Sequence, residues 1–340
     1  MKIENLWPQL ESARANASKG RKASGWVLRQ IRPSAACPLH AGVELMSGQR
    51  GLLLRVEPSL VPSKRHWPNC RGLEIVSSPQ GTELLFGVMM KESRHSDMFS
   101  ALAEDLARRV SQAPVSEGKI SALLGGLARW QKFLASKAEG LSPEARRGLW
   151  AELHFLGCEL VPACGPERSV AAWQGPTGAA QDFLIGGGAI EIKATSGKPP
   201  FVVTVSSERQ LDSQGLSRLF LRHYALAERE GAGEPLPVTV AKLRALLAGT
   251  AAAELFEDRL LQAGYLDVHA PLYETTGWIA RGCSDFAVKK GFPRIVEKDL
   301  PPGVGSLRYA LALAACEPYA VTAEVLRRAI KSPPLPKHHK

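Results

Sequence analysis

Three side chains that could together bind a metal ion and assist phosphodiester hydrolysis stand in one short segment, residues 181–193. Its sequence is QDFLIGGGAIEIK, in which two apolar runs flank three glycines. This pattern predicts a β-hairpin, and a two-residue turn at the first two glycines sets Asp182 opposite Glu191. Directly opposed residues have Cβ atoms about 4.5 to 5.5 Å apart, so these two carboxylates repel unless a cation lies between them. Because side chains alternate along a strand, Lys193 shares the face of Glu191.

An Asp, a Glu and a Lys on one face are the set that metal-dependent phosphodiester hydrolysis requires. A hard divalent cation held by carboxylates polarises the scissile phosphate and lowers the pKa of its bound water. The ammonium of Lys193 would orient the attacking water or stabilise the charge that develops on the phosphate. The alternative is an ordinary hairpin whose polar residues face solvent.

A helix upstream of the hairpin can supply a further carboxylate. Ser142 can cap this helix, Pro143 suits its first position and Gly157 can end it, which predicts a helix over residues 143–156. Glu152 lies on the flank of the apolar stripe, where a carboxylate can face a second metal ion or its water. The alternative is a glutamate at the rim of the helix with no role in chemistry.

The rest of the chain combines strand and helix patterns. Short apolar runs broken by Gly and Pro indicate β structure over residues 1–95, as a small antiparallel sheet or partial barrel. Helical periodicity predicts two helices between Asp97 and Glu139. Downstream we expect a strand at Phe201–Ser206, a helix at about Ser213–Glu228, helices near 238–248 and 250–263, and a strand-rich stretch over Tyr273–Leu313.

The order of a helix with Glu152, a strand with Asp182, a hairpin, Glu-x-Lys, a strand and a helix resembles the PD-(D/E)XK nuclease superfamily, which includes restriction endonucleases and repair nucleases. Asp182, Glu191 and Lys193 match its D, E and K positions. Gln181 stands where the motif usually has proline. That proline shapes the approach to the strand rather than performing chemistry, so the three reactive positions remain intact.

The resemblance extends to a bacterial group called PD-(D/E)XK motif proteins. It is carried by the runs WQGP at 173–176 and VSSERQL at 205–211. Genes of this group lie near helicase-like and GHKL-type ATPase genes in restriction or phage-defence clusters. The resemblance therefore implies a nuclease component of such a system, with ATPase or helicase proteins as partners.

We therefore expect an α/β fold with five parts. These are a β-rich N-terminal domain (1–95), a helical connector (96–140), a restriction-endonuclease-like catalytic core (141–230), a mixed helical and strand region (231–330) and a disordered tail (331–340).

The predicted activity is that of a Mg²⁺-dependent DNA endonuclease, in which Mn²⁺ can substitute. Asp182 and Glu191 would ligate the metal with help from the Ile192 carbonyl. Lys193 would assist the nucleophilic water, and Glu152 would hold a second metal or its water.

Further residues are candidates for the site and for DNA contacts. Gln210 could meet the site, as glutamines do in several branches of the superfamily, or it could be a turn residue that bonds the backbone. The candidate DNA contacts are Lys198, Ser207, Arg209, Lys289, Lys290 and Arg294. The alternative for such charged loop residues is a solvated surface.

Composition restricts the class of protein. Lys and Arg number 43 against 33 Asp and Glu, and the net charge of +10 favours a polyanionic partner such as DNA. Six cysteines without metal-ligand spacing indicate reduced, mostly packed thiols. No run of 18 apolar residues and no signal peptide is present, so we expect a cytoplasmic protein without a membrane partner.

Two other functions fit the same residues. One is a catalytically silent DNA-binding or assembly subunit that recruits an ATPase or helicase, and the other is an RNA or structure-specific nuclease. Because duplex cleavage normally needs two active sites, a homodimer is a further expectation. The sequence leaves the recognition site, the choice between nicking and double-strand cleavage, and the role of the N-terminal domain open.

Overall fold

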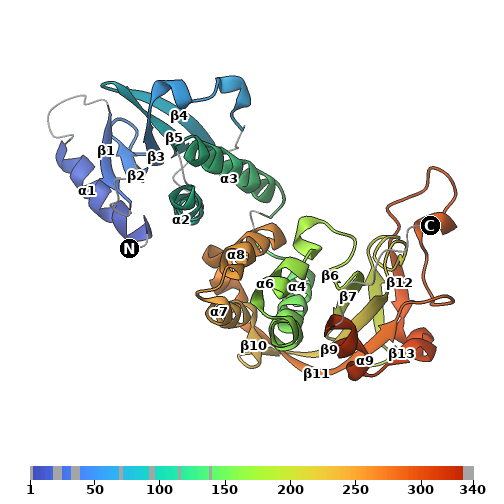
Figure 1. The fold of residues 1–340 in the computed structure, drawn as a ribbon. Coiled ribbons are helices and arrows are strands. Elements are labelled where there is room, and N and C mark those ends of the chain that lie inside the picture. Colours follow the sequence, from blue (N-terminus) through green and yellow to red (C-terminus); the bar gives the residue numbers. More distant parts are fainter. Residues whose placement is uncertain are drawn as a thin grey trace. The chain divides into compact units, whose positions relative to one another are not determined.

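The chain forms two compact units, Met1–Ala138 and Glu139–Lys340. The computed structural model describes residues 3–17, 25–31, 39–68, 72–91, 96–113, 116–137 and 140–331. The predicted tail at 331–340 therefore lies outside the described residues except for its first residue. Figure 1 shows the helices and strands of each unit.

The first unit is built on a five-stranded antiparallel sheet with the strand order β1-β2-β3-β5-β4. Its strands are β1 (Trp26–Gln30), β2 (Leu39–Glu44), β3 (Arg50–Val56), β4 (Leu73–Gln80) and β5 (Glu83–Met90). In β3 the consecutive residues Leu52, Leu53 and Leu54 are all buried, so this central strand is covered on both faces. The predicted β structure of this part of the chain is confirmed.

Three helices accompany this sheet: α1 (Trp7–Ala17), α2 (Ser96–Gln112) and α3 (Ser116–Lys137). The last two confirm the pair predicted from helical periodicity. The first was not predicted, because Trp7 and Leu10 are its only buried residues and two positions make too short a pattern.

The second unit has a mixed sheet with the order β10-β11-β9-β7-β6, and β13 pairs with β11 beside this path. β7 and β9 run parallel, and the other neighbours are antiparallel. The strands are β6 (Phe183–Ile185), β7 (Gly188–Thr195), β9 (Leu219–Glu230), β10 (Glu234–Pro235), β11 (Thr276–Ala287) and β13 (Ala320–Val321). A separate ribbon consists of β8 (Val202–Val205) and β12 (Tyr309–Ala312).

Helices cover one face of this sheet and the β8–β12 ribbon covers the other (Figure 1). Ile190 and Ile192 of β7 pack against the helices, whereas Ala189 packs with Val203 and Val205 of the ribbon. The helices are α4 (Pro143–Phe155), α5 (Val161–Cys164), α6 (Pro166–Ala172), α7 (Leu236–Leu247), α8 (Ala252–Ala263) and α9 (Ala323–Lys331). Short 3₁₀ helices lie at Ile3–Leu6, Pro58–Leu60, Lys64–His66, Gly175–Thr177, Asp267–Tyr273, Glu297–Asp299 and Leu313–Tyr319.

The helix predicted over Ser213–Glu228 is wrong. This segment contains most of β9, which lies between β7 and β11 at the centre of the sheet. All six residues from Leu219 to Tyr224 are buried, because β9 is covered on both faces. Such a strand shows no alternation of polar and apolar residues, so its pattern does not differ from that of a buried helix.

The helix predicted to end at Gly157 continues past it. α4 passes into a π-helical turn, η5 (Leu156–Leu160), and then into α5, which ends at Gly165 with φ of 79°. A Cβ atom at position 157 would lie 3.1 Å from a methyl carbon of Leu243. Gly157 therefore lets α7 pack closely against the chain instead of stopping the helix.

The described cysteines are free, as predicted, but half of them are accessible. Cys158 and Cys283 are exposed, Cys164 is partly exposed and Cys316 is buried, so the expectation of mostly packed thiols is wrong for this set. Cys37 and Cys70 lie outside the described residues.

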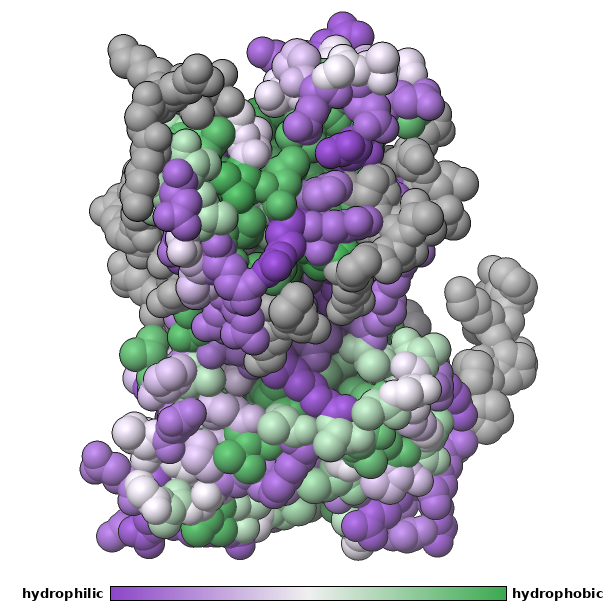
Figure 2. Space-filling view, turned by 90° about the vertical axis from the view of Figure 1, so that its left-hand side faces the viewer, coloured by the Kyte–Doolittle hydropathy of each residue, from purple (hydrophilic) through white to green (hydrophobic). Residues whose placement is uncertain are grey.

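The surface of both units mixes hydrophilic and hydrophobic side chains. On the face of the first unit that Figure 2 shows, a hydrophobic area lies among hydrophilic side chains. Among the described helices, none has an apolar stretch long enough to cross a bilayer.

Candidate active site

The predicted hairpin carries the candidate site. Its two-residue turn has positive φ values of 60° and 75° at the first two glycines, as a type I′ turn requires. β6 begins at Phe183, which pairs with Ile190. Asp182, one residue earlier, is therefore level with Glu191 on β7, as the register predicted.

Asp182 lies beside the edge of β7 that β6 leaves without a strand neighbour. Because β6 has three residues, β7 has no strand neighbour on this side beyond Ile190. The Ile192 N–H on this open side donates to Asp182 Oδ2 at 2.7 Å. The Asp182 carbonyl accepts from the Gln174 N–H at 2.7 Å and from the Gly175 N–H at 2.9 Å. Hydrogen bonds on both sides thus fix the position of this carboxylate.

Glu191 and Lys193, two residues apart on β7, form an ion pair that is largely buried. Glu191 is 0% exposed, and its Oε1 lies 2.7 Å from Lys193 Nζ. Its Oε2 is buried and has no hydrogen-bond partner among the described residues. Lys193 Nζ also donates to Gln210 Oε1 at 3.1 Å, and the Ser206 N–H donates to the same oxygen at 2.7 Å. Gln210 therefore contacts the site through Lys193 and also accepts a hydrogen bond from the backbone of its own turn.

Glu152 reaches the same cluster from α4. Its Oε2 accepts a hydrogen bond of 2.7 Å from Trp173 Nε1. Gly175 lies between the two carboxylates, since a Cβ atom there would stand 2.9 Å from Asp182 Oδ1 and 3.4 Å from Glu152 Oε2. A side chain at this position would crowd both acids, so glycine is needed where the chain passes them.

The crowding of acids raises their pKa values. Burial, followed by the charge of Asp182, raises the pKa of Glu191 to about 8. Burial and then the charge of Asp182 hold the pKa of Glu152 well above its usual range, and burial raises that of Asp182. Burial lowers the pKa of Lys193, but the charges of Glu191, Asp182 and Glu152 outweigh it and raise this pKa overall. The cluster therefore favours bound protons or an added cation.

Gln181, which stands at the proline position of the motif, supports the site through the backbone. It is buried, and its Nε2 donates to the carbonyls of Arg209 at 2.8 Å and Gln210 at 3.3 Å. A proline would supply no such donor. The turn that carries Gln210, and through it Lys193, is thus tied to the residue beside Asp182.

A family model described as "Putative PD-(D/E)XK family member, (DUF4420)" matches residues 3–314. The chain belongs to the PD-(D/E)XK superfamily. No curated protein and no solved structure matches the chain. The mixed α/β architecture is consistent with the restriction-endonuclease-like fold of this superfamily.

The structure brings together all five residues predicted for catalysis in this PD-(D/E)XK protein, namely Glu152, Asp182, Glu191, Lys193 and Gln210. Sequence reasoning missed the roles of Trp173 and Gly175, although both stand in the run that carries the family resemblance. It also treated Gln181 as a neutral departure from the motif, whereas its amide holds the turn.

The predicted DNA contacts lie in three segments of the second unit, after β7, after β8 and after β11. Lys198 is exposed on the loop after β7. Ser207 and Arg209 belong to the turn that carries Gln210; the Ser207 hydroxyl accepts from the Arg209 N–H, and the exposed Arg209 guanidinium pairs with Glu297 at 3.4 Å.

The other three candidates follow β11. Lys289 and Lys290 are exposed, and the ammonium of Lys289 lies 6.0 Å from the centre of the Tyr319 ring. Arg294 donates to the Leu211 carbonyl and, at 3.1 Å, to the Ser213 hydroxyl. Its guanidinium therefore also stabilises the loop after Gln210.

The donor set suits a hard divalent cation. Within the described part of the chain, no three Asp, Glu, His or Cys side chains stand in the spacing of a ready-formed metal site. The orphaned Oε2 of Glu191 and the raised pKa values nevertheless show a cluster short of positive charge. Carboxylate oxygens are ligands that Mg²⁺ and Mn²⁺ accept, so the residues fit such an ion.

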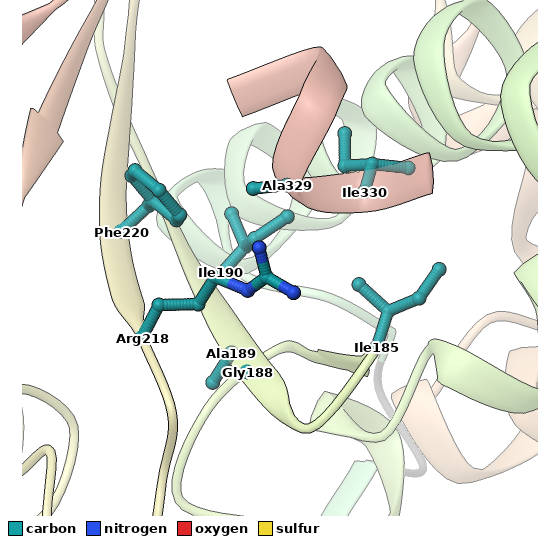
Figure 3. A pocket seen from close by; sticks show the side chains of 8 residues that line it. All are labelled: Ile185, Gly188, Ala189, Ile190, Arg218, Phe220, Ala329 and Ile330. Atoms are coloured by element: carbon teal, nitrogen blue, oxygen red, sulfur yellow. The ribbon is translucent and has the colours of Figure 1, made fainter. Parts of the chain in front are cut away.

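One small pocket lies away from these residues (Figure 3). It is lined mainly by apolar side chains of the hairpin, β9 and α9, with Arg218 at its side. None of the five predicted catalytic residues lines it. It is too small to hold more than a water molecule.

Proposed function

We propose that this protein is a metal-dependent DNA endonuclease. The observation that carries the proposal is the buried Glu191 with one unpartnered carboxylate oxygen, beside Lys193 and level with Asp182. Burying an unpaired charged oxygen is costly, and a cation bound beside it would remove that cost.

Asp182 and Glu191 would hold the ion, with the Ile192 carbonyl as a third ligand. The ion is Mg²⁺, with Mn²⁺ as a substitute, and when bound it would polarise the scissile phosphate and lower the pKa of a coordinated water. Glu152 would hold a second ion or its water, and Trp173 keeps one of its oxygens oriented through a hydrogen bond of 2.7 Å.

Lys193 contributes a fixed positive charge. Because its pKa is raised, its Nζ stays protonated at neutral pH and does not take a proton from water. Glu191 and Gln210 hold this Nζ from two sides. A preorganised ammonium of this kind stabilises negative charge that develops on a phosphate during hydrolysis.

The DNA substrate is supported by the net charge of +10. A role in a bacterial restriction or anti-phage system, with ATPase or helicase partners, is supported by the resemblance carried by residues 173–176 and 205–211. The DNA substrate and the role in a defence system are therefore both parts of the proposal.

A nuclease assay in Mg²⁺ and in Mn²⁺ tests the activity. We expect the unaltered protein to cleave DNA, and D182A and K193A each to lose activity by orders of magnitude while keeping their fold by circular dichroism. R168A, which removes an exposed arginine of α6, is the control and should retain activity. Equal cleavage by all four proteins would end the catalytic assignment.

Parallel substrates and a binding measurement separate the rival functions. Digestion of RNA or of branched DNA in preference to plain duplex would replace the DNA endonuclease with an RNA or structure-specific enzyme. Salt-sensitive DNA binding without cleavage, and without any thermal stabilisation by Mg²⁺, would identify a silent binding subunit.

A further inference from the structure

Two arginines, one from α4 and one from β11, donate hydrogen bonds to the loop that follows β7. Arg147 of α4 donates from Nη1 to the Ser196 hydroxyl at 3.4 Å. Arg281 of β11 donates from Nη2 to the Gly197 carbonyl at 2.7 Å. Lys198 is the next residue and is exposed. Three positive charges thus surround a loop that begins three residues after Lys193.

A β-bulge directs Arg281 to this loop. In the pairing of β11 with β9, Ala280 faces Leu226 and Gly282 faces Ala225, so Arg281 is the extra residue between them. A bulge turns its extra side chain away from the regular alternation and is often found beside functional sites. Here the guanidinium bonds the loop after β7, the second strand along from β11 in the sheet.

No described acid forms an ion pair with Arg147, Lys198 or Arg281. Hydrogen bonds from its own backbone N–H and from Ser142, and to a lesser degree the charge of Arg147, lower the pKa of Glu144 in the first turn of α4, but Glu144 and Arg147 form no ion pair. Arg147 donates to a hydroxyl and Arg281 to a carbonyl, and these neutral acceptors leave both positive charges unneutralised. Arg244, in contrast, is held by both Glu257 and Asp267.

We propose that Arg147, Lys198 and Arg281 form a binding surface for the phosphate backbone of DNA. The assignment of DNA as the ligand rests on the proposed function, because this surface continues the strand that carries Lys193. Three residues of strand span about 10 Å. Ser196, where this surface begins, is therefore about 10 Å along the chain from Lys193.

Binding of a 20-base-pair duplex in a chelating buffer, measured over a salt series, tests this surface without requiring cleavage. We expect R147Q/R281Q to weaken binding by roughly 10- to 100-fold at low salt and to reduce the slope of log affinity against log salt by about two. The matched control is R168Q/R328Q, which removes two exposed arginines of α6 and α9. This control should change affinity and slope much less.

Equal losses in the two double variants would overturn the proposal, because the effect would then be one of net charge. Tighter binding of duplex RNA than of DNA, lost in R147Q/R281Q, would overturn the assignment of DNA. R147K/R281K keeps both charges and should recover most of the salt slope. If the unaltered protein binds the duplex but does not cleave it in Mg²⁺, and this binding is weakened in R147Q/R281Q, the result would count against the catalytic proposal and not against this surface.

Discussion

At the scale of single residues, Glu191 is an acid in surroundings that disfavour its negative charge. It is fully buried, Asp182 is level with it across the hairpin, and only one of its oxygens is paired. Burial and the charge of Asp182 together raise its pKa to about 8, against an ordinary value of 4.5. Such a group destabilises a folded protein when it is ionised and has no cation beside it.

This raised pKa predicts a pH-dependent stability for the metal-free protein. An acid with a higher pKa in the folded state contributes stability at low pH and loses it as pH rises from about 4.5 to about 8. Between pH 6.5 and 8 the loss should reach about 2 kcal/mol. Burial lowers the pKa of His223 to about 4, so this side chain is about half protonated in the unfolded state at pH 6.5 and offsets only roughly 0.4 kcal/mol of the loss.

Chemical unfolding in a chelating buffer at pH 6.5 and pH 8 measures this loss. E191Q should show a smaller loss between the two pH values, because its amide does not ionise. Adding Mg²⁺ at pH 8 should stabilise the unaltered protein and have little effect on E191Q. Identical pH dependence in both proteins would contradict the assigned pKa.

At the scale of elements, the short length of β6 makes room for the site. β7 loses its strand neighbour after Ile190, and Asp182, Gly175 and Glu152 occupy the open side. The turn after β8 brings Gln210 into hydrogen-bond contact with Lys193. This turn depends on Gln181 and Arg294, whose side chains donate hydrogen bonds to its carbonyls.

Replacing Gln181 tests the dependence of this turn. In Q181A two backbone carbonyls lose a buried donor, which should cost about 1–3 kcal/mol of unfolding free energy. Because Gln210 would no longer be held against Lys193, any cleavage activity should fall as well. The measurements are urea unfolding and the nuclease assay. Q214A is the control, since this exposed glutamine uses only its backbone N–H in the same loop, and it should match the unaltered protein.

At the scale of the whole molecule, the family model spans both units, but the candidate site belongs to one. The five predicted catalytic residues all lie within Glu139–Lys340, which has its own extensive hydrophobic core between the sheet and its helices. The first unit has a separate sheet with buried leucines in its central strand. Each unit therefore has the means to fold on its own.

This organisation predicts that the fragment Glu139–Lys340 folds without the first unit and keeps its response to metal. Its thermal unfolding should remain cooperative, and Mg²⁺ should raise its midpoint as in the full chain. The same fragment carrying D182A is the control and should show no such rise. An unfolded fragment would mean that the second unit needs the first for its stability.

Much of the site could be predicted from the chain because its information is local. The glycine turn sets the register of the hairpin, and that register alone brings Asp182 level with Glu191 and puts Lys193 on the same face. The signals at Ser142 and Pro143 likewise located the start of α4, and the Ser142 hydroxyl accepts from the Ala145 N–H at the cap.

Other features depend on residues far apart in the chain. The sequence of β9 predicts a helix because layers on both faces of the sheet bury its side chains, and Gly157 predicts a helix end although its role is to let Leu243 pack closely. Gln181 bonds a turn 28 residues away, and Arg281 bonds a loop 84 residues away. Periodicity and turn chemistry act over a few neighbouring residues, so the sequence determined the reactive set and its hairpin. Burial, pKa and long-range hydrogen bonding depend on which segments pack together, and these only the tertiary structure decided.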